Sequence, residues 1–325
     1  MNIRNWAFDQ GIIRSRKFDI PVIAVGNLNV GGTGKSPQIE YLIRLLMPAF
    51  EIAVLSRGYG RTTKGFLLSD ENSTAEQLGD EPLQFYRKFK NLCVAVDENR
   101  EHGIEQIQRL KPEVELVLLD DAFQHRYVEA GLYVLLTAWD DLYADDLLLP
   151  AGNLREPKRG AKRADIIVVT KCPPQLSAEE QVSIVNKLHP RPHQKVFFNT
   201  IVYQDRILGK EKEIFINDLN AYGVLLVTGI ANPKPLMKFL SYHRVSFQHM
   251  KFADHQNLGN KELQTISLRY DTIDGDKKII LTTEKDYVRN FLNVDLPVYY
   301  LPIRTEFVEN GEGFNNLIND YVRKN

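Results

Sequence analysis

One stretch constrains this chain of 325 residues more than any other: Asn29-Val30-Gly31-Gly32-Thr33-Gly34-Lys35-Ser36. It follows an apolar run at 21–25 and precedes an amphipathic run at 39–46, which predicts the order strand, glycine loop, helix. In that order the loop can turn successive backbone N–H groups toward an anion, and the helix directs its positive end to the same point. The sequence therefore predicts a phosphate-binding loop, with Lys35 reaching the β- and γ-phosphates and the Ser36 hydroxyl on Mg²⁺.

Asn29 occupies the position where the general pattern G-x-x-x-x-G-K-[ST] has its first glycine. Asparagine tolerates a left-handed backbone better than most non-glycine residues, so we expect the turn to form with Asn29 in it. The alternative is a glycine-rich turn that binds nothing, and the flanking strand and helix argue against it.

Length and composition describe an ordinary globular protein of about two domains. The net charge of −1 gives no general attraction to nucleic acid, and we expect no nucleic-acid partner. We find no cleavable signal and no apolar run long enough to span a membrane. Cys93 and Cys172 read as buried apolar residues, so we expect a cytosolic protein that can still touch a membrane surface.

Apolar runs that alternate with amphipathic segments predict parallel α/β sheets. We expect the strands of a first domain at 21–25, 51–55, 92–96, 116–119, 132–136 and 166–169. Further strands are expected at 224–227, 245–247, 279–281 and 298–300. The sequence thus predicts a P-loop core domain over residues 1–200 and a smaller α/β domain over residues 201–325.

Two adjacent acids, Asp120 and Asp121, follow the apolar strand at 116–119. Buried carboxylates are costly unless they meet a cation or hydrogen-bond donors. A strand that ends in acids is also what a P-loop enzyme needs to hold Mg²⁺, directly or through water. Earlier in the chain, Asp80 in Gly79-Asp80-Glu81-Pro82 reads as the N-cap of a helix.

Three segments leave two readings open. Residues 1–20 mix apolar and basic side chains, which suits a terminal helix packed on the core or a helix lying on a membrane. The run 155–163 holds five basic residues and one acid, and it reads as a solvated surface or as a contact with phosphate or anionic lipid. The loop residues Asp254-His255 are either structural or a general base with its orienting carboxylate.

Taken in order, these motifs resemble the tetraacyldisaccharide 4′-kinase family, the lipid A 4′-kinases of Gram-negative bacteria. The resemblance covers about residues 20–290 and rests on Val25-Gly26-Asn27 with the P-loop, 56–61, 79–82, Asp120-Asp121 with 123–125, 150–157, Asp254-His255 and 282–286. Asn29 also resembles the family. The family usually has glycine where Ala122 stands and often a second histidine where Gln256 stands, so only His255 is carried over.

The resemblance implies transfer of the γ-phosphoryl group of ATP, with Mg²⁺, to the 4′-hydroxyl of a tetraacyldisaccharide 1-phosphate. It implies a peripheral position on the cytoplasmic face of the inner membrane. The sequence gives no evidence of an obligate protein partner. It also implies a RecA-like P-loop core with a smaller C-terminal domain that closes the catalytic cleft. By motif match, Asp80 and His255 would form the dyad that activates the hydroxyl. Lys35 and Arg155 would stabilise the transferred group, and Ser36, Asp120 and Asp121 would serve Mg²⁺.

Other P-loop classes are the alternatives. A partition-type ATPase, acting as a nucleotide-dependent switch, has a similar loop, but that class has lysine where this chain has Val30. GTPases share an Asn/Thr-Lys-x-Asp motif that reads guanine. The similar segment here, Thr170-Lys171-Cys172-Pro173, lacks the acid. A non-catalytic scaffold would have no need for Asp80 and His255 to converge.

Overall fold

The computed structural model describes residues 2–254 and 256–325, and the chain divides into two compact units. The first unit holds the residues up to Ile201 together with Thr305–Asn325, and the second is Val202–Arg304. The expected second domain, 201–325, therefore differs at its C-terminal end. Helix α10 (Gly311–Lys324) packs with the first unit because Phe314 and Ile318 are fully buried in its core.

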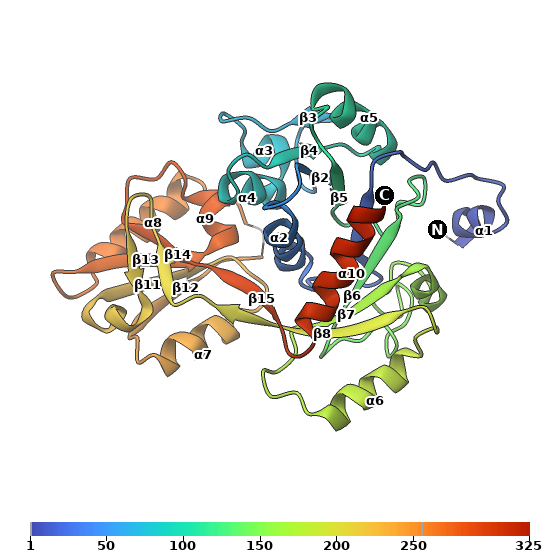
Figure 1. Cartoon of the computed structure of the whole chain (residues 1–325). Helices are drawn as coiled ribbons and strands as arrows, with labels where there is room; N and C mark the ends of the chain where they lie inside the picture. Colours follow the sequence, from blue (N-terminus) through green and yellow to red (C-terminus); the bar gives the residue numbers. More distant parts are fainter. Residues whose placement is uncertain (1, 255) are drawn as a thin grey trace. The chain divides into compact units, whose positions relative to one another are not determined.

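The first unit is built on a sheet with the strand order β15-β8-β7-β6-β1-β5-β2-β4-β3. Figure 1 labels the strands β2 to β8 and β15 of this sheet. Its strands are β1 (Val22–Asn27), β2 (Ile52–Ser56), β3 (Leu67–Leu68), β4 (Cys93–Val96), β5 (Leu116–Leu119), β6 (Leu132–Ala138), β7 (Ile166–Thr170), β8 (Lys195–Tyr203) and β15 (Ile303–Phe307). Its other helices are α1 (Asn2–Asp9), α2 (Lys35–Leu46), α3 (Ala75–Leu78), α4 (Asp80–Lys88), α5 (Arg100–Leu110), α6 (Ala178–Leu188) and the 3₁₀ helix η1 (Lys158–Arg163).

Strand β1 lies at the centre of this sheet, between β5 and β6 and parallel to both. After β1 the chain lays down β2, β4 and β5 on one side, and it then crosses to build β6, β7 and β8 on the other. The strand order therefore reverses beside β1. In open α/β sheets, ligands bind at such a reversal, beyond the carboxyl ends of the strands.

Helices cover both faces of the sheet. On one face, α2 buries Ile39, Leu42 and Ile43 at helical spacing, and α10 joins the same apolar cluster. On the other face, Ile104 and Ile107 of α5 pack against the strands. These layers fix α2 and the strand ends that surround its first turn.

The second unit has its own sheet, in the order β10-β9-β14-β13-β11-β12. Its elements are β9 (Arg206–Leu208), β10 (Glu213–Phe215), the 3₁₀ helix η2 (Ile216–Ala221), β11 (Gly223–Thr228), α7 (Lys234–Tyr242), β12 (Phe247–Lys251), α8 (Asn260–Asp271), β13 (Lys278–Thr283), α9 (Glu284–Asn290) and β14 (Val298–Leu301). The strand expected at 245–247 begins at Phe247, because Val245 belongs to the tight turn after α7, where its N–H donates to the Leu240 carbonyl. Among the described residues, every helix is too short or too polar to cross a bilayer.

Candidate active site

The predicted phosphate loop joins β1 to α2. Gly31 and Gly34 have φ angles of 116° and 80°, which favour glycine. Lys35 and Ser36 are the first two residues of α2. Their backbone N–H groups have no intrahelical acceptor and stand at the positive end of the helix dipole. The loop thus has the backbone of an anion-binding site.

Asn29 acts differently from the expectation. The described residues with positive φ do not include it, and the left-handed positions fall on Gly31 and Gly34. Its buried side chain donates a hydrogen bond from Nδ2 to Asp146 Oδ2 at 3.0 Å, and its backbone pairs with Leu154. Asn29 therefore anchors the start of the loop to the segment that runs from Asp146 to Leu154.

The far side of the loop is fixed by the end of β7. Thr170 Oγ1 donates to the Thr33 carbonyl at 2.7 Å, and Lys171 Nζ donates to the Gly32 carbonyl. Because a peptide unit is planar, holding its carbonyl also fixes the N–H of the next residue. Thr170 and Lys171 therefore position loop N–H groups, a role that sequence reasoning missed because it weighed these residues only as a guanine motif.

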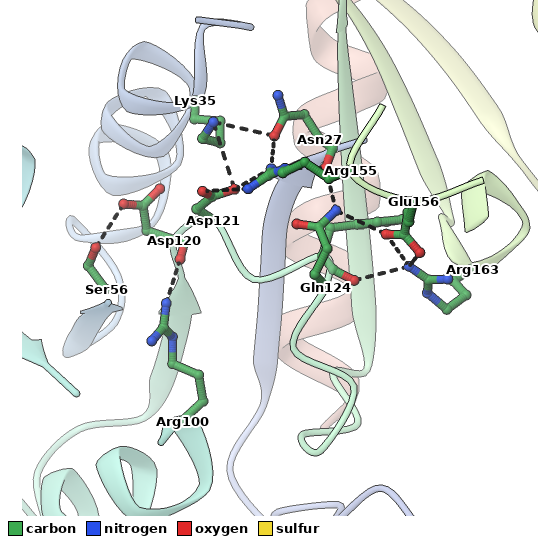
Figure 2. A network of polar contacts seen from close by, with 11 residues as sticks. Asn27, Lys35, Ser56, Arg100, Asp120, Asp121, Gln124, Arg155, Glu156 and Arg163 are labelled. Carbon is green, nitrogen blue, oxygen red and sulfur yellow. Dashed lines mark hydrogen bonds and ion pairs between the residues drawn. The ribbon is translucent and has the colours of Figure 1, made fainter. Parts of the chain in front are cut away.

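A polar cluster forms where β1 and β5 end (Figure 2). Lys35 Nζ lies 3.3 Å from Asn27 Oδ1 and 3.7 Å from Asp121 Oδ1. The Arg155 guanidinium donates to both carboxylate oxygens of Asp121, at 2.8 and 3.1 Å, and also to Asn27 Oδ1. The structure thus brings together Lys35, Asp121 and Arg155 from the predicted site and adds Asn27, the last residue of β1.

The pKa values of the two neighbouring acids are shifted in opposite directions. Burial alone would raise the pKa of Asp121, but the hydrogen bond from Arg155 and the charge of Lys35 outweigh it and lower that pKa. For Asp120, burial and then the charges of Glu81 and Asp121 raise the pKa to about 7, against a hydrogen bond from Ser56 Oγ at 3.0 Å. A divalent cation would stabilise the negative charge on Asp120.

The donor set fits Mg²⁺. Within the described ranges, no group of three or more His, Cys, Asp or Glu side chains is placed to hold a metal ion. Mg²⁺ does not need such a cage, because it is usually bound by one or two carboxylates together with water and substrate phosphates. Asp120 and Asp121 offer the carboxylates, and Ser36 offers a hydroxyl in the first turn of α2.

A buried network supports this cluster (Figure 2). Gln124 Nε2 donates to the Asn27 carbonyl at 2.7 Å and to Glu156 Oε1 at 2.9 Å. The Glu156 carboxylate is almost fully buried and accepts hydrogen bonds from Arg163 Nη2 at 2.9 Å on both oxygens. Glu156 directly follows Arg155, so this network holds the backbone that carries the Arg155 guanidinium.

The family model for tetraacyldisaccharide-1-P 4′-kinases matches residues 1–323. The chain belongs to this family. It is 50% identical to the tetraacyldisaccharide 4′-kinase of Flavobacterium johnsoniae over 327 residues, which cover 100% of this chain and 94% of that relative. The tetraacyldisaccharide 4′-kinase of Bacteroides thetaiotaomicron is 43% identical, with coverage of 100% and 90%.

A solved structure agrees with this assignment. The crystal structure of LpxK from Aquifex aeolicus in complex with ATP has a TM-score of 0.78 and 29% identity, and the match covers 99% of this chain and 94% of that one. The predicted family, the P-loop α/β fold and the kinase activity are therefore confirmed, and the partition-type alternative is not favoured.

Asp80 is the first residue of α4 and not the residue that precedes the helix, as the sequence predicted. The N-cap is Gly79, whose φ of 91° suits glycine, so the expectation that Asp80 caps the helix is wrong. An acid in the first turn still meets the positive end of the helix. The next residue, Glu81, acts electrostatically on Asp120, which places the start of α4 near the acidic loop.

His255, the other half of the expected dyad, lies outside the described residues.

The segment 282–286, where strand β13 of the second unit passes into α9, makes hydrogen bonds within that unit. Asp286 Oδ2 accepts hydrogen bonds from the Gly229 backbone N–H at 2.9 Å and from Thr283 Oγ1 at 2.8 Å. Thr283 in turn caps the N-terminus of α9.

Positive charge gathers beside Asp121. Burial and then the charges of Arg100 and Arg57 lower the pKa of His125 to about 4, so this imidazole is neutral at pH 7. Arg61 has a structural role, because its buried side chain pairs with Glu98 at 2.8 Å. Arg57 is exposed at the end of β2, where it can meet an anionic substrate.

Proposed function

We propose that this chain transfers the γ-phosphoryl group of ATP to the 4′-hydroxyl of a tetraacyldisaccharide 1-phosphate, with Lys35 and Arg155 as the electrostatic catalysts. ATP with Mg²⁺ is the donor that a P-loop kinase of this family uses. The observation that carries the residue assignment is the pair of cations, Lys35 and Arg155, held on one carboxylate, Asp121, just after the strand β5 that neighbours β1.

In this proposal, the loop N–H groups bind the phosphates and Lys35 turns from Asp121 toward them. The 3.7 Å separation of Lys35 from Asp121 is long for a hydrogen bond, so this contact is readily exchanged. Arg155 keeps two hydrogen bonds to Asp121 and so holds both groups in place. Preorganised positive charge of this kind stabilises the charge that develops on a transferred phosphoryl group. Mg²⁺, held by Ser36, Asp120 and Asp121, would neutralise phosphate charge.

Asp80 and His255 are proposed to activate the 4′-hydroxyl. A sugar hydroxyl is a poor nucleophile near pH 7, and a positioned base contributes about 10²–10⁴-fold. Motif match to the family supports both residues, and the position of Asp80 at the start of α4 supports its part. If the two residues act as one unit, the double variant Asp80→Asn/His255→Gln will lose about as much kcat as the more damaging single variant. Losses that multiply would contradict the dyad.

Because the acceptor is a glycolipid, we expect the reaction to take place at a membrane surface. We propose that the kinase works at the cytoplasmic face of the inner membrane and that α1 contacts it. Trp6 of α1 and Ile12 beyond it are exposed, and Arg4 of the same helix donates to the Gln124 carbonyl at 2.9 Å. Amphipathic segments of this composition bind at the lipid interface. The variant Trp6→Ser/Ile12→Ser removes two exposed apolar side chains and leaves Arg4 and Asn5 in place. It should weaken sedimentation with vesicles more than kcat on detergent-dispersed acceptor, and unchanged sedimentation would contradict this role.

The proposed function is tested by transfer of label from γ-labelled ATP to the detergent-dispersed glycolipid, with wild type, Lys35→Met and Lys90→Met. Lys90 is an exposed lysine of the first unit, just after α4, and serves as the matched control. We expect labelled lipid from wild type and the control, and a loss of about 10³-fold with Lys35→Met. Similar rates for the two lysine variants would exclude the assigned role of Lys35.

A further inference from the structure

Three consecutive leucines stand exposed on the surface of the first unit. Leu147, Leu148 and Leu149, here called the leucine loop, are 58%, 37% and 53% exposed. Scattered apolar side chains are normal on a protein surface, but a run of three on one loop is unusual unless it has a function. None of the catalytic roles proposed above uses these residues.

The leucines are exposed on a tightly fixed backbone. The Asp146 carboxylate accepts the backbone N–H groups of Leu147 and Asn153 at 2.7 and 3.0 Å, and the Leu154 N–H donates to the Leu147 carbonyl at 2.9 Å. A Cβ atom at Gly152 would collide with Asp146 and with the Leu147 carbonyl, so this turn closes only around glycine. The fold therefore holds the leucines outward instead of letting them fold back.

The leucine loop is joined to the phosphate loop through the same short segment. The Val30 N–H donates to the Asn153 carbonyl at 2.7 Å, and the Arg155 N–H donates to the Leu28 carbonyl at 2.7 Å. Val30, a residue of the phosphate loop, is also an exposed apolar side chain. A lipid that meets the leucine loop thus meets the protein beside its reaction centre.

The surroundings favour a bilayer over a groove for a single acyl chain. The neighbouring cavity of about 400 Å³ is lined by five acids together with Trp139, Leu142 and Ile184, and none of the three leucines lines it. Lys158, Arg159 and Lys162 of η1 are exposed, and the Lys158 ammonium donates to the Ala144 carbonyl just before the loop. Exposed lysine and arginine next to apolar side chains suit anionic headgroups above acyl chains.

The two acids that directly precede the leucine loop, Asp145 and Asp146, already have partners in the protein. Asp145 forms an ion pair with Lys187 at 3.1 Å. Asp146 accepts hydrogen bonds from Asn29 and from the loop backbone, and these contacts hold its pKa below the usual range. The charge of Asp145 is thus paired with a cation, and the Asp146 carboxylate is engaged by hydrogen bonds that hold the loop together.

We propose that the leucine loop inserts into the acyl region of the membrane and places the phosphate loop at the lipid surface. This inference rests on the proposed function, because it explains how an acceptor whose chains remain in the bilayer reaches the reaction centre. The partner is the bilayer itself, with its acyl chains on the leucines and its anionic headgroups on η1.

Sedimentation with vesicles of phosphatidylethanolamine and phosphatidylglycerol, without acceptor, tests this proposal. The full chain is compared as wild type, Leu147→Ser/Leu149→Ser and the control Leu268→Ser, whose leucine is 63% exposed on α8 of the second unit. We expect the double variant to lose about tenfold in partitioning, each single variant about threefold, and the control nothing.

Transfer to detergent-dispersed acceptor is measured in parallel. If wild type transfers no phosphate, the proposed function fails whatever the vesicles show. If wild type transfers phosphate and the leucine variants sediment like the control, the leucine-loop proposal is wrong. Unchanged sedimentation together with a raised KM for dispersed acceptor would assign the leucines to the acceptor's own chains and overturn the proposal as well. Because the single variants change the loop least, they decide the question if the double variant misfolds.

Discussion

Replacing Glu156 with glutamine should destabilise the first unit and slow transfer. The groups that hydrogen-bond to the Glu156 carboxylate are all donors: Gln124 Nε2 at 2.9 Å, Arg163 Nη2 at 2.9 Å and Asn5 Nδ2 at 3.2 Å. A glutamine amide would turn its own N–H groups against one of these donors and leave the Arg163 charge without its partner. Breaking a buried ion pair in this way costs about 3–5 kcal/mol.

The size of the unit converts this cost into a shift of melting temperature. Unfolding entropy is about 2.1 cal/mol/K per residue, which gives about 0.5 kcal/mol/K for a unit of about 220 residues. A loss of about 3–5 kcal/mol should therefore lower Tm by about 6–11 °C. We expect kcat to fall as well, because Gln124 and Glu156 hold the backbone on either side of the Asn27–Arg155 contact.

The assay is thermal unfolding followed by circular dichroism, with Glu105→Gln as the matched control. Glu105 pairs with Arg16 on the surface, where both side chains are largely exposed, and such a pair contributes about 0–1 kcal/mol. The control should therefore shift Tm by no more than about 2 °C. Equal shifts for Glu156→Gln and the control would refute the argument that the buried pair supports the site.

Three further changes probe other parts of the structure. Thr170→Val should raise KM for ATP by about tenfold, since the buried Thr33 carbonyl loses its donor, and an unchanged KM in ATP titrations would remove the positioning role. The pKa of His125 is about 4 in the folded protein, below its value of about 6.5 in the unfolded chain. As pH falls from 6.5 through 4, the unfolded chain therefore takes up the proton first, and the free energy of unfolding decreases. Urea unfolding of His125→Asn should therefore lose less stability over that range than wild type, and equal losses would contradict this reading. Phe314→Ala, which empties a fully buried position in α10, should lower the free energy of unfolding by about 3–5 kcal/mol in the same assay, and a change below about 1 kcal/mol would show that α10 does not complete the first core.

The sequence predicted those parts of the site that depend on local patterns. The phosphate loop, the strand before it and the helix after it are contiguous, and their glycine spacing and periodicity specify them directly. Asp120 and Asp121 were placed at the loop because polar residues that end a buried strand are uncommon without a partner. The ordered motifs then predicted the family, which the comparisons confirm.

The remaining contacts join residues far apart in the chain. Thr170 and Thr33 are separated by 137 positions, and Gln124 and Asn27 by 97, so no local pattern pairs them. Residues 305–325 were assigned to the second domain on position alone. An amphipathic C-terminal helix does not specify which sheet it covers, and here it covers the first.

The central claim is that this chain phosphorylates a lipid instead of using ATP as a switch. The most direct measurement compares ATP consumption with labelled lipid formed from tetraacyldisaccharide 1-phosphate, and then locates the new phosphate by mass spectrometry. We predict one labelled lipid per ATP consumed, with the new phosphate on the 4′-hydroxyl and no comparable hydrolysis without acceptor. ATP hydrolysis that leaves the lipid unlabelled would contradict the account.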